Sequence, residues 1–271
     1  MRIKLALASV LSVIAAISAA AHDLFLKFDS YFLRPNSTAT VRVLNGSFQK
    51  SEGTVRRERM QDVSVVAPHA EVFRPPATAW RDTGETSLLT LQTMTAGTYA
   101  VGVSMKPREI DLKAKDFNEY LAHDGIPDML AARRRSGELN RDVRERYSKH
   151  VRAVFQVGDA RSDEYKRALG YPVEIIPQQN PYSLRIGQTL EVLCTLDGQP
   201  LANQFVLAGR ETKAGRMSRE VGARTDANGV ARFELSGAGK WYVKMIHMTP
   251  LDDPQAQYES KWATLTFELK P

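Results

Sequence analysis

The amino-acid sequence predicts a mainly β protein made of two β-sandwich-like units with a helical insertion between them. Segments that alternate polar and apolar residues, the period of a half-buried strand, occur in both halves of the chain. A charged stretch poor in β-branched residues interrupts them, and prolines near residue 180 break the chain before the second set. We therefore expect a signal segment at 1–21, a first unit at 22–172 and a second unit at 173–271.

The chain begins like a secretory signal peptide. Two cations precede an apolar run at 5–17, and small residues follow at 18–21. This order is typical of a cleavable signal, and the run is too short to span a bilayer as a helix. Cleavage after Ala20 and cleavage after Ala21 both satisfy the small-residue rule, and only the second makes His22 the first mature residue. We expect an exported protein, periplasmic or secreted, with no membrane span after cleavage; the alternative is an uncleaved N-terminal anchor.

The first unit, residues 22–172, contains several strand-like segments. The clearest runs from Thr38 to Leu44, where polar and apolar residues alternate before the turn signal Asn45-Gly46. The expected strands of this unit are 22–32, 38–44, 63–66, 86–91, 98–103 and 151–157.

Residues 114–150 form the expected helical insertion. Phe117, Tyr120 and Leu121 recur at helical spacing, and Gly125-Ile-Pro127 separates one helix from the next. Arginines interspersed with acids follow, which is typical of a solvated helix face with ion pairs. The alternative is a surface that docks an acidic partner. The arginines are Arg133, Arg134, Arg135, Arg141, Arg144 and Arg146.

The second unit, residues 173–271, has short strand-like segments separated by turn residues, as in a sandwich. Its cysteine, Cys194, is the only one in the chain, so disulfides do not hold the fold. Cys194 alternates with apolar residues and is expected to be a small buried side chain. The expected strands are 183–186, 189–196, 204–207, 231–235, 240–247 and 262–269.

Two stretches of the second unit carry a resemblance. Asp197-Gly-Gln-Pro-Leu-Ala202 precedes a strand, Thr225-Asp-Ala-Asn-Gly229 opens another, and Gly239-Lys-Trp-Tyr-Val243 begins a third. This order resembles immunoglobulin-like and transthyretin-like sandwich modules of exported bacterial proteins. Asp226-Ala-Asn-Gly229 tolerates positive φ, so we expect it to join two adjacent antiparallel strands.

The mature chain as a whole resembles a narrower group. The segments that carry this resemblance are Ala21-His-Asp-Leu-Phe-Leu26, Val43-Leu-Asn-Gly46, Tyr147-Ser-Lys-His150, Phe155-Gln-Val-Gly158 and Ile246-His-Met248. They are similar to an uncharacterised exported bacterial family grouped with the periplasmic component of nickel and cobalt uptake systems (NikM-like). The resemblance implies a link to transition metals. The chain departs from the transport component in lacking a C-terminal membrane helix, which argues against a direct transport role.

His22 is the strongest candidate metal ligand, because cleavage after Ala21 would place a free α-amine beside its imidazole. A second imidazole would complete the three-nitrogen arrangement called a histidine brace, which suits Cu(II) and Ni(II). An α-amine has a pKa of roughly 7.7–8.0, so it gives up its proton to a metal readily near neutral pH. His247, on an expected strand, is the best candidate for the second imidazole.

Four more residues complete the candidate set. Met245 shares a strand face with His247, and a thioether favours Cu(I); the alternative interpretation of Met245 is core packing. His150 is the next candidate imidazole, and Asp23 and Glu259 are placed to orient imidazoles through hydrogen bonds. The expected ion is one copper, nickel or cobalt.

The sequence argues against several function classes. It contains no nucleophile elbow, no phosphate-binding glycine loop and no basic stretch interleaved with stacking aromatics. We therefore expect a non-catalytic exported protein that binds a transition metal for uptake, buffering or delivery, with the ion or a periplasmic or cell-surface protein as partner and no nucleic acid. One alternative is a metal-free structural or adhesive module that binds a polymer or a protein. Another is a copper oxygenase that uses the same brace.

Overall fold

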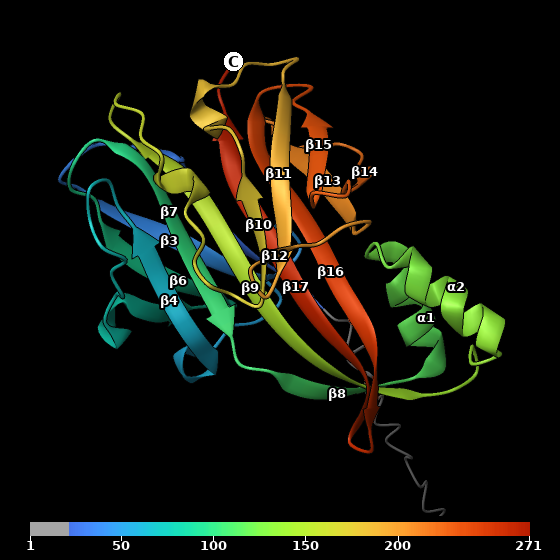
Figure 1. Ribbon diagram of the computed structural model, residues 1–271. Helices are drawn as coiled ribbons and strands as arrows, with labels where there is room; N and C mark the ends of the chain where they lie inside the picture. The colour runs from blue at the N-terminus through green and yellow to red at the C-terminus, as the bar shows by residue number, and fades with distance from the viewer. Residues whose placement is uncertain (1–21) are drawn as a thin grey trace, which may run out of the picture.

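The computed structural model describes residues 22–271, and the predicted signal peptide at 1–21 lies outside them. In this part of the chain the fold is mainly β, with three sheets in a sandwich-like arrangement and two short helices, as the sequence predicts (Figure 1). Neither helix has the length and hydropathy that crossing a membrane requires.

A nine-stranded sheet forms the centre of the molecule (Figure 1). Its main path runs through β14 (Val221–Arg224), β13 (Phe205–Glu211), β16 (Gly239–Asp253), β17 (Ala256–Leu269), β9 (Val143–Val157), β7 (Gly97–Met105) and β4 (Met60–Val66). Two further strands, β2 (Phe32–Leu33) and β8 (Arg108–Leu112), also pair with β9. Strands β9 and β17 pair in parallel along much of their length, which joins the two halves of the sheet.

Adjacent residues of a strand point to opposite sides of a sheet, so the central sheet has two faces. The first face carries Val151 and Phe155 and packs on the sheet of β1 (Asp23–Phe28), β3 (Thr38–Gly46), β6 (Thr86–Gln92) and β5 (Trp80–Thr83). The second face carries Val154 and Leu265 and packs on the sheet of β10 (Val173–Pro177), β11 (Thr189–Leu196), β12 (Gln199–Pro200) and β15 (Val230–Glu234).

The two predicted units share this central sheet instead of forming separate sandwiches. Strand β9 of the first unit lies between β7 of the same unit and β17 of the second. Sequence alternation indicates where strands lie but not which strands pair, so the shared sheet was not predictable from it. The second unit begins at its predicted bound with β10, a strand that was not predicted, whereas the expected strand at 183–186 does not form.

The helical insertion is shorter than predicted. Helix α1 (Ala114–His123) and helix α2 (Pro127–Ser136) are present, but residues 143–150, expected to be helical, form the first half of β9. The apolar side of α1 packs on the first face of the sheet, against Trp262 and Ile246. Pairing with β8 on one side and β17 on the other overrides the charged composition of the segment.

Arg133 corrects the interpretation of the arginines as a solvated face. Its side chain is 1% exposed and donates hydrogen bonds to Tyr258 Oη and to the carbonyl oxygens of Glu138 and Arg141. The guanidinium carbon lies 4.9 Å from the centroid of the Phe117 ring. Arg133 therefore holds the loop after α2 against β17 and is a structural residue of the insertion.

The turn at 226–229 also differs from the expectation. It joins β14 of the central sheet to β15 of the outer sheet, so it links two sheets and does not close a hairpin. Gly229 does have a positive φ of 75°.

Cys194 is buried on β11 as predicted, and burial raises the pKa of its thiol to about 12. Four short 3-10 helices complete the described chain: η1 (Arg57–Arg59), η2 (Ala77–Ala79), η3 (Glu164–Lys166) and η4 (Pro181–Ser183).

Candidate functional site

The histidines that the sequence predicts as ligands of one metal ion lie on different faces of the central sheet. His22 immediately precedes β1 and lies on the first face, where its carbonyl oxygen accepts a hydrogen bond from Lys149 Nζ of β9. His150 follows Lys149 on the same strand and therefore points to the second face, as does His247 of β16. The central sheet thus lies between His22 and His247, and the two imidazoles do not come together.

His22 lies where the sheet that contains β1 approaches the end of α1. We call His22, Asp23, Glu52, Lys149 and Lys244 the N-terminal junction. The Nε2 atom of His22 lies 3.3 Å from a carboxylate oxygen of Glu52, and 30% of the His22 side chain is exposed. Asp23 Oδ2 accepts a 2.8 Å hydrogen bond from Lys244 Nζ. Contacts to both residues thus hold the start of β1 in one place.

Two buried lysines make these contacts. Lys149 is 4% exposed, and burial lowers the pKa of its ammonium to about 8 although the nearby carboxylates of Asp23 and Glu145 oppose the shift. Lys244 is 6% exposed, and burial alone would lower its pKa as well. The carboxylates of Asp23, Asp124 and Glu220 outweigh that effect, so the pKa of Lys244 is raised.

Glu145 is a buried acid between the junction and the helices. It accepts hydrogen bonds from Tyr120 Oη, at 3.2 Å, and from Ser260 Oγ. Its second carboxylate oxygen has no partner among the described residues. Burial raises the pKa of Glu145 to about 7, and the two hydrogen bonds and the Lys149 charge only partly offset this shift.

The other predicted residues lie on the second face. His150 lies between two serines, with Nδ1 2.9 Å from Ser104 Oγ and Nε2 3.0 Å from Ser148 Oγ. Burial lowers the pKa of His150 to about 4, and the positive charge of Lys261 adds to the shift. Glu259 forms an ion pair with Lys261 and so does not orient an imidazole.

His247 and Met245 belong to different surroundings although both face the same side of β16. The Nδ1 atom of His247 lies 3.1 Å from Gln204 Oε1, and burial and the Lys261 charge lower its pKa. Met245 is 2% exposed and packs in the core between the central and second outer sheets. Its surroundings match the core-packing interpretation.

The described residues contain no group of three or more His, Cys, Asp or Glu side chains placed to hold a metal ion. The His22 amine is a further donor, from the backbone, that signal cleavage would create. Lys149, Lys244 and Glu145 are functional-site residues that the sequence did not predict. One feature of the sequence could have identified them: each is a charged residue on a strand face whose neighbours, two residues away, are apolar or aromatic. Lys244, between Tyr242 and Ile246, is an example.

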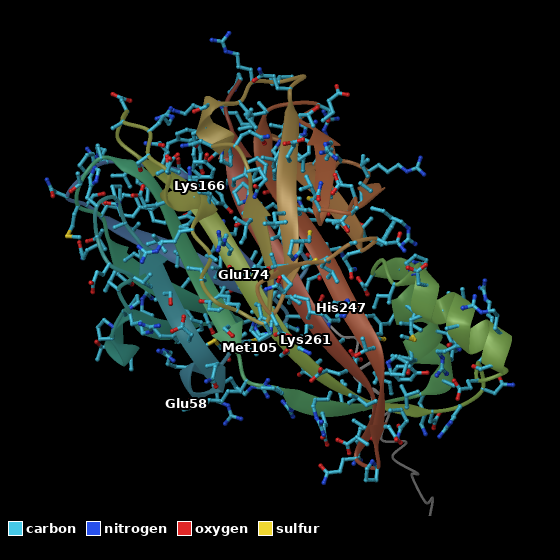
Figure 2. The ribbon with its side chains drawn as sticks, in the orientation of Figure 1. Glu58, Met105, Lys166, Glu174, His247 and Lys261 are labelled. Atoms are coloured by element: carbon cyan, nitrogen blue, oxygen red, sulfur yellow. The ribbon has the colours of Figure 1, made fainter. Side chains whose placement is uncertain are left out.

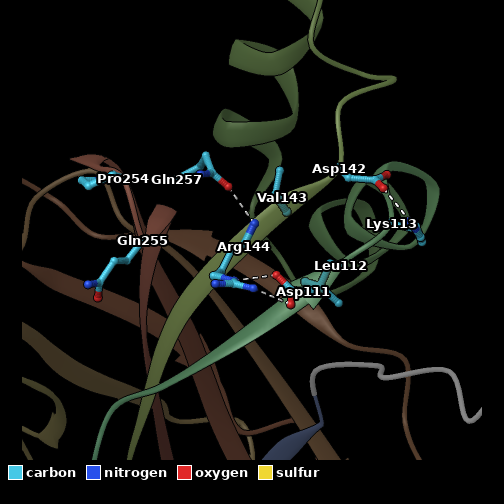
Figure 3. A pocket seen from close by; sticks show the side chains of 9 residues that line it. All are labelled: Asp111, Leu112, Lys113, Asp142, Val143, Arg144, Pro254, Gln255 and Gln257. Atoms are coloured by element: carbon cyan, nitrogen blue, oxygen red, sulfur yellow. Dashed lines mark hydrogen bonds and ion pairs between the residues drawn. The ribbon is translucent and has the colours of Figure 1, made fainter.

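A cavity of about 450 Å³ near the β16–β17 turn offers a contrast (Figure 3). Its charged side chains pair with each other: Arg144 with Asp111, and Lys113 with Asp142, in contacts of 2.6 to 2.8 Å. All four side chains are largely exposed, so the pairs are screened by water and give no specific chemistry.

The fold defines a mainly β protein of sandwich-like sheets. The chain belongs to the family described as a domain of unknown function, DUF4198, whose profile matches residues 19–249. Comparison with curated proteins finds no match. Among solved structures, the native conformation of E. coli alpha-2-macroglobulin has a TM-score of 0.22 and 11% identity, covering 92% of this chain and 14% of that one. This chain therefore spans a small part of that protein's length, and the likeness supports no argument about function.

Proposed function

We propose that the mature chain is an exported protein that binds one copper, nickel or cobalt ion at His22, for uptake, buffering or delivery. The N-terminal junction is the observation that supports this most, because Glu52 and Lys149 hold His22 and Lys244 holds Asp23. A chelating residue at a free chain end loses conformational entropy when it binds an ion. Contacts that already order the residue reduce that cost.

The contact between His22 and Glu52 favours the chelating tautomer. A carboxylate attracts a ring N–H and repels a ring lone pair, so a proton on Nε2, 3.3 Å from Glu52, is favoured. The lone pair then lies on Nδ1, the ring nitrogen that closes a chelate ring with the α-amine of the same residue. Metal-bound imidazoles commonly donate their other N–H to a carboxylate, which is the role proposed for Glu52.

The proposed site leaves coordination positions open. Two nitrogens of one residue supply only part of a metal's coordination shell, and His22 keeps 30% of its side chain exposed. Water or a periplasmic or cell-surface partner can supply the rest, which suits an ion that is passed on. The NikM-like resemblance supports a transition metal, and the immunoglobulin-like and transthyretin-like resemblance supports a binding module over an enzyme.

Calorimetric titration with Cu(II) and Ni(II) tests the proposal on mature protein that begins at His22. We expect one ion per chain, with affinity falling from pH 8 to pH 5 as the nitrogen ligands take up protons. His22→Ala should weaken binding by at least an order of magnitude, about 1.4 kcal/mol. One extra N-terminal residue should do the same, because it removes the α-amine from beside the imidazole while it keeps every side chain.

His247→Ala is the matched control, since it removes an imidazole from the opposite face of the sheet. We expect it to bind metal like the unaltered mature protein. Equal affinity in the mature, extended and His22→Ala proteins would contradict the proposal and favour the metal-free module.

A further inference from the structure

A row of polar side chains crosses the second face of the central sheet. Members on neighbouring strands are register partners, and the row shifts by two residues along β9, from His150 to Ser148. The row consists of Asp62 on β4, Ser104 on β7, His150 and Ser148 on β9, Lys261 on β17 and His247 on β16. Figure 2 shows Lys261 and His247 next to each other on this part of the sheet. Farther along the same strands this face is apolar and is covered by β10 and β11.

A cavity of about 500 Å³ lies over the row from Asp62 to Lys261. We call it the polar groove. Its floor is formed by Ser104, Ser148 and His150, which are all less than a tenth exposed. The volume is within the range of small-molecule sites, roughly 300–1,000 Å³, and the polar floor under it is built from buried side chains on rigid strands.

One serine hydroxyl of the floor has a hydrogen that is not used in a hydrogen bond to His150. With its lowered pKa, the imidazole of His150 is neutral near pH 7, so one ring nitrogen donates and the other accepts. Ser104 and Ser148 therefore play different parts. One hydroxyl donates to the ring, while the other accepts from it and keeps its own O–H for a ligand.

The charges of the groove walls cancel in pairs. Arg74 Nε lies 2.8 Å from Asp62 on one side, and Lys261 pairs with Glu259 on the other. A ligand with a net charge would attract one member of each pair and repel the other. A neutral ligand with several hydroxyls avoids that cost, because each hydroxyl can donate to a carboxylate and accept from a cation. Leu169 and Tyr171 add apolar contacts beside the polar row.

We propose that the polar groove binds a neutral polyhydroxylated molecule, a saccharide of one or two rings. The groove lies on the opposite face of the sheet from His22, so this binding does not depend on the metal site proposed above.

The test uses mature protein labelled with ¹³C at its leucine methyl groups. Glucose, N-acetylglucosamine, maltose and cellobiose are titrated, with citrate and glutamate as charged comparisons. Leu169 lines the groove, whereas Leu130 lies on α2, away from it. We expect at least one neutral sugar to shift the Leu169 signals in a saturable way and to leave Leu130 unchanged, while the charged compounds shift neither.

Two variants test whether the sugar binds in the polar groove. Ser148→Ala removes a floor hydroxyl, and Glu259→Gln removes the charge of a wall carboxylate whose side chain is 27% exposed. Each should weaken sugar binding about tenfold, which corresponds to about 1.4 kcal/mol. Asp142→Asn, in the cavity of Figure 3, is the matched control and should bind like the parent.

Three results would overturn the proposal. One is that no sugar of the set shifts the Leu169 signals, and a second is that only citrate or glutamate does. The third is that Glu259→Gln, shown by circular dichroism to be folded, binds sugar as tightly as the parent.

Discussion

The two faces of the central sheet hold their lysine side chains in different ways. On the first face, Lys149 and Lys244 find partners in His22 and Asp23, a segment far from them in sequence. On the second face, Lys261 pairs with Glu259 two residues away on its own strand. A buried ammonium needs a partner, so the first arrangement orders the start of β1. The local pair of the partly exposed Lys261 leaves this part of the second face open as a groove.

This difference suggests how one sheet can support two kinds of site. The start of β1 is held in place by its contacts with buried lysines, as the proposed chelating role of His22 requires. In the polar groove the charges pair locally, so the remaining hydrogen-bonding groups are available to a ligand.

The largest expected effect on stability comes from removing the charge of Lys244, which pairs with Asp23 at the start of β1. Lys244→Met leaves the carboxylates of Asp23, Asp124 and Glu220 without their shared partner, and breaking a buried pair in this way costs about 3–5 kcal/mol. Lys261→Met breaks a pair whose side chains are 21% and 27% exposed, and should cost about 1 kcal/mol or less. Urea unfolding of both variants measures the difference. Equal losses would mean that the two faces hold their cations alike.

Glu145 makes the first face sensitive to pH. Its pKa is about 7 in the folded protein against 4.5 for an unperturbed glutamate, so the folded state binds the extra proton between these values. Stability from this group is present below pH 4.5 and is lost as pH rises to 7, by up to about 3 kcal/mol. In Glu145→Gln that loss should disappear, as measured by urea unfolding at pH 5 and pH 8. The exposed Glu119→Gln is the control, and a Glu145→Gln profile identical to the parent's would contradict the assignment.

Gly229 tests how tightly the second outer sheet is attached. Gly229 and Gly215 have φ of 75° and 76°, so alanine is strained at both. A Cβ at Gly229 would lie 2.8 Å from Leu201 N and 2.9 Å from Cys194 O, whereas one at Gly215 meets nothing within 4 Å. We expect Gly215→Ala to cost about 1 kcal/mol and Gly229→Ala about 2 kcal/mol or more. Thermal unfolding compares them, and equal costs would show that the turn can relax.

The smallest effect is expected at Cys194, behind the second face. Burial raises the pKa of its thiol to about 12, so almost no thiolate is present at pH 8. A thiol reagent should leave the native protein unmodified and label Cys194 only after denaturant is added. Rapid labelling of native protein would indicate that β11 opens readily.

Several features were predictable because they depend on local pattern. Alternation marked Thr38 to Leu44 and Thr189 to Leu196 as strands, and it also indicated that Cys194 is buried. Helical spacing of Phe117, Tyr120 and Leu121 identified the buried side of α1. These patterns repeat within a few residues, so one segment at a time is enough to read them.

Pairing between distant segments decided the rest. Residues 143–150 became strand because β8 and β17 flank them, and Arg133 became buried because Tyr258 lies opposite it. The same pairing put His22 and His247 on opposite faces, since the parallel register of β9 with β17 sets which side each side chain takes. A shift of one residue in register reverses every side chain of a strand, and no local pattern in a single sequence specifies that register between distant strands.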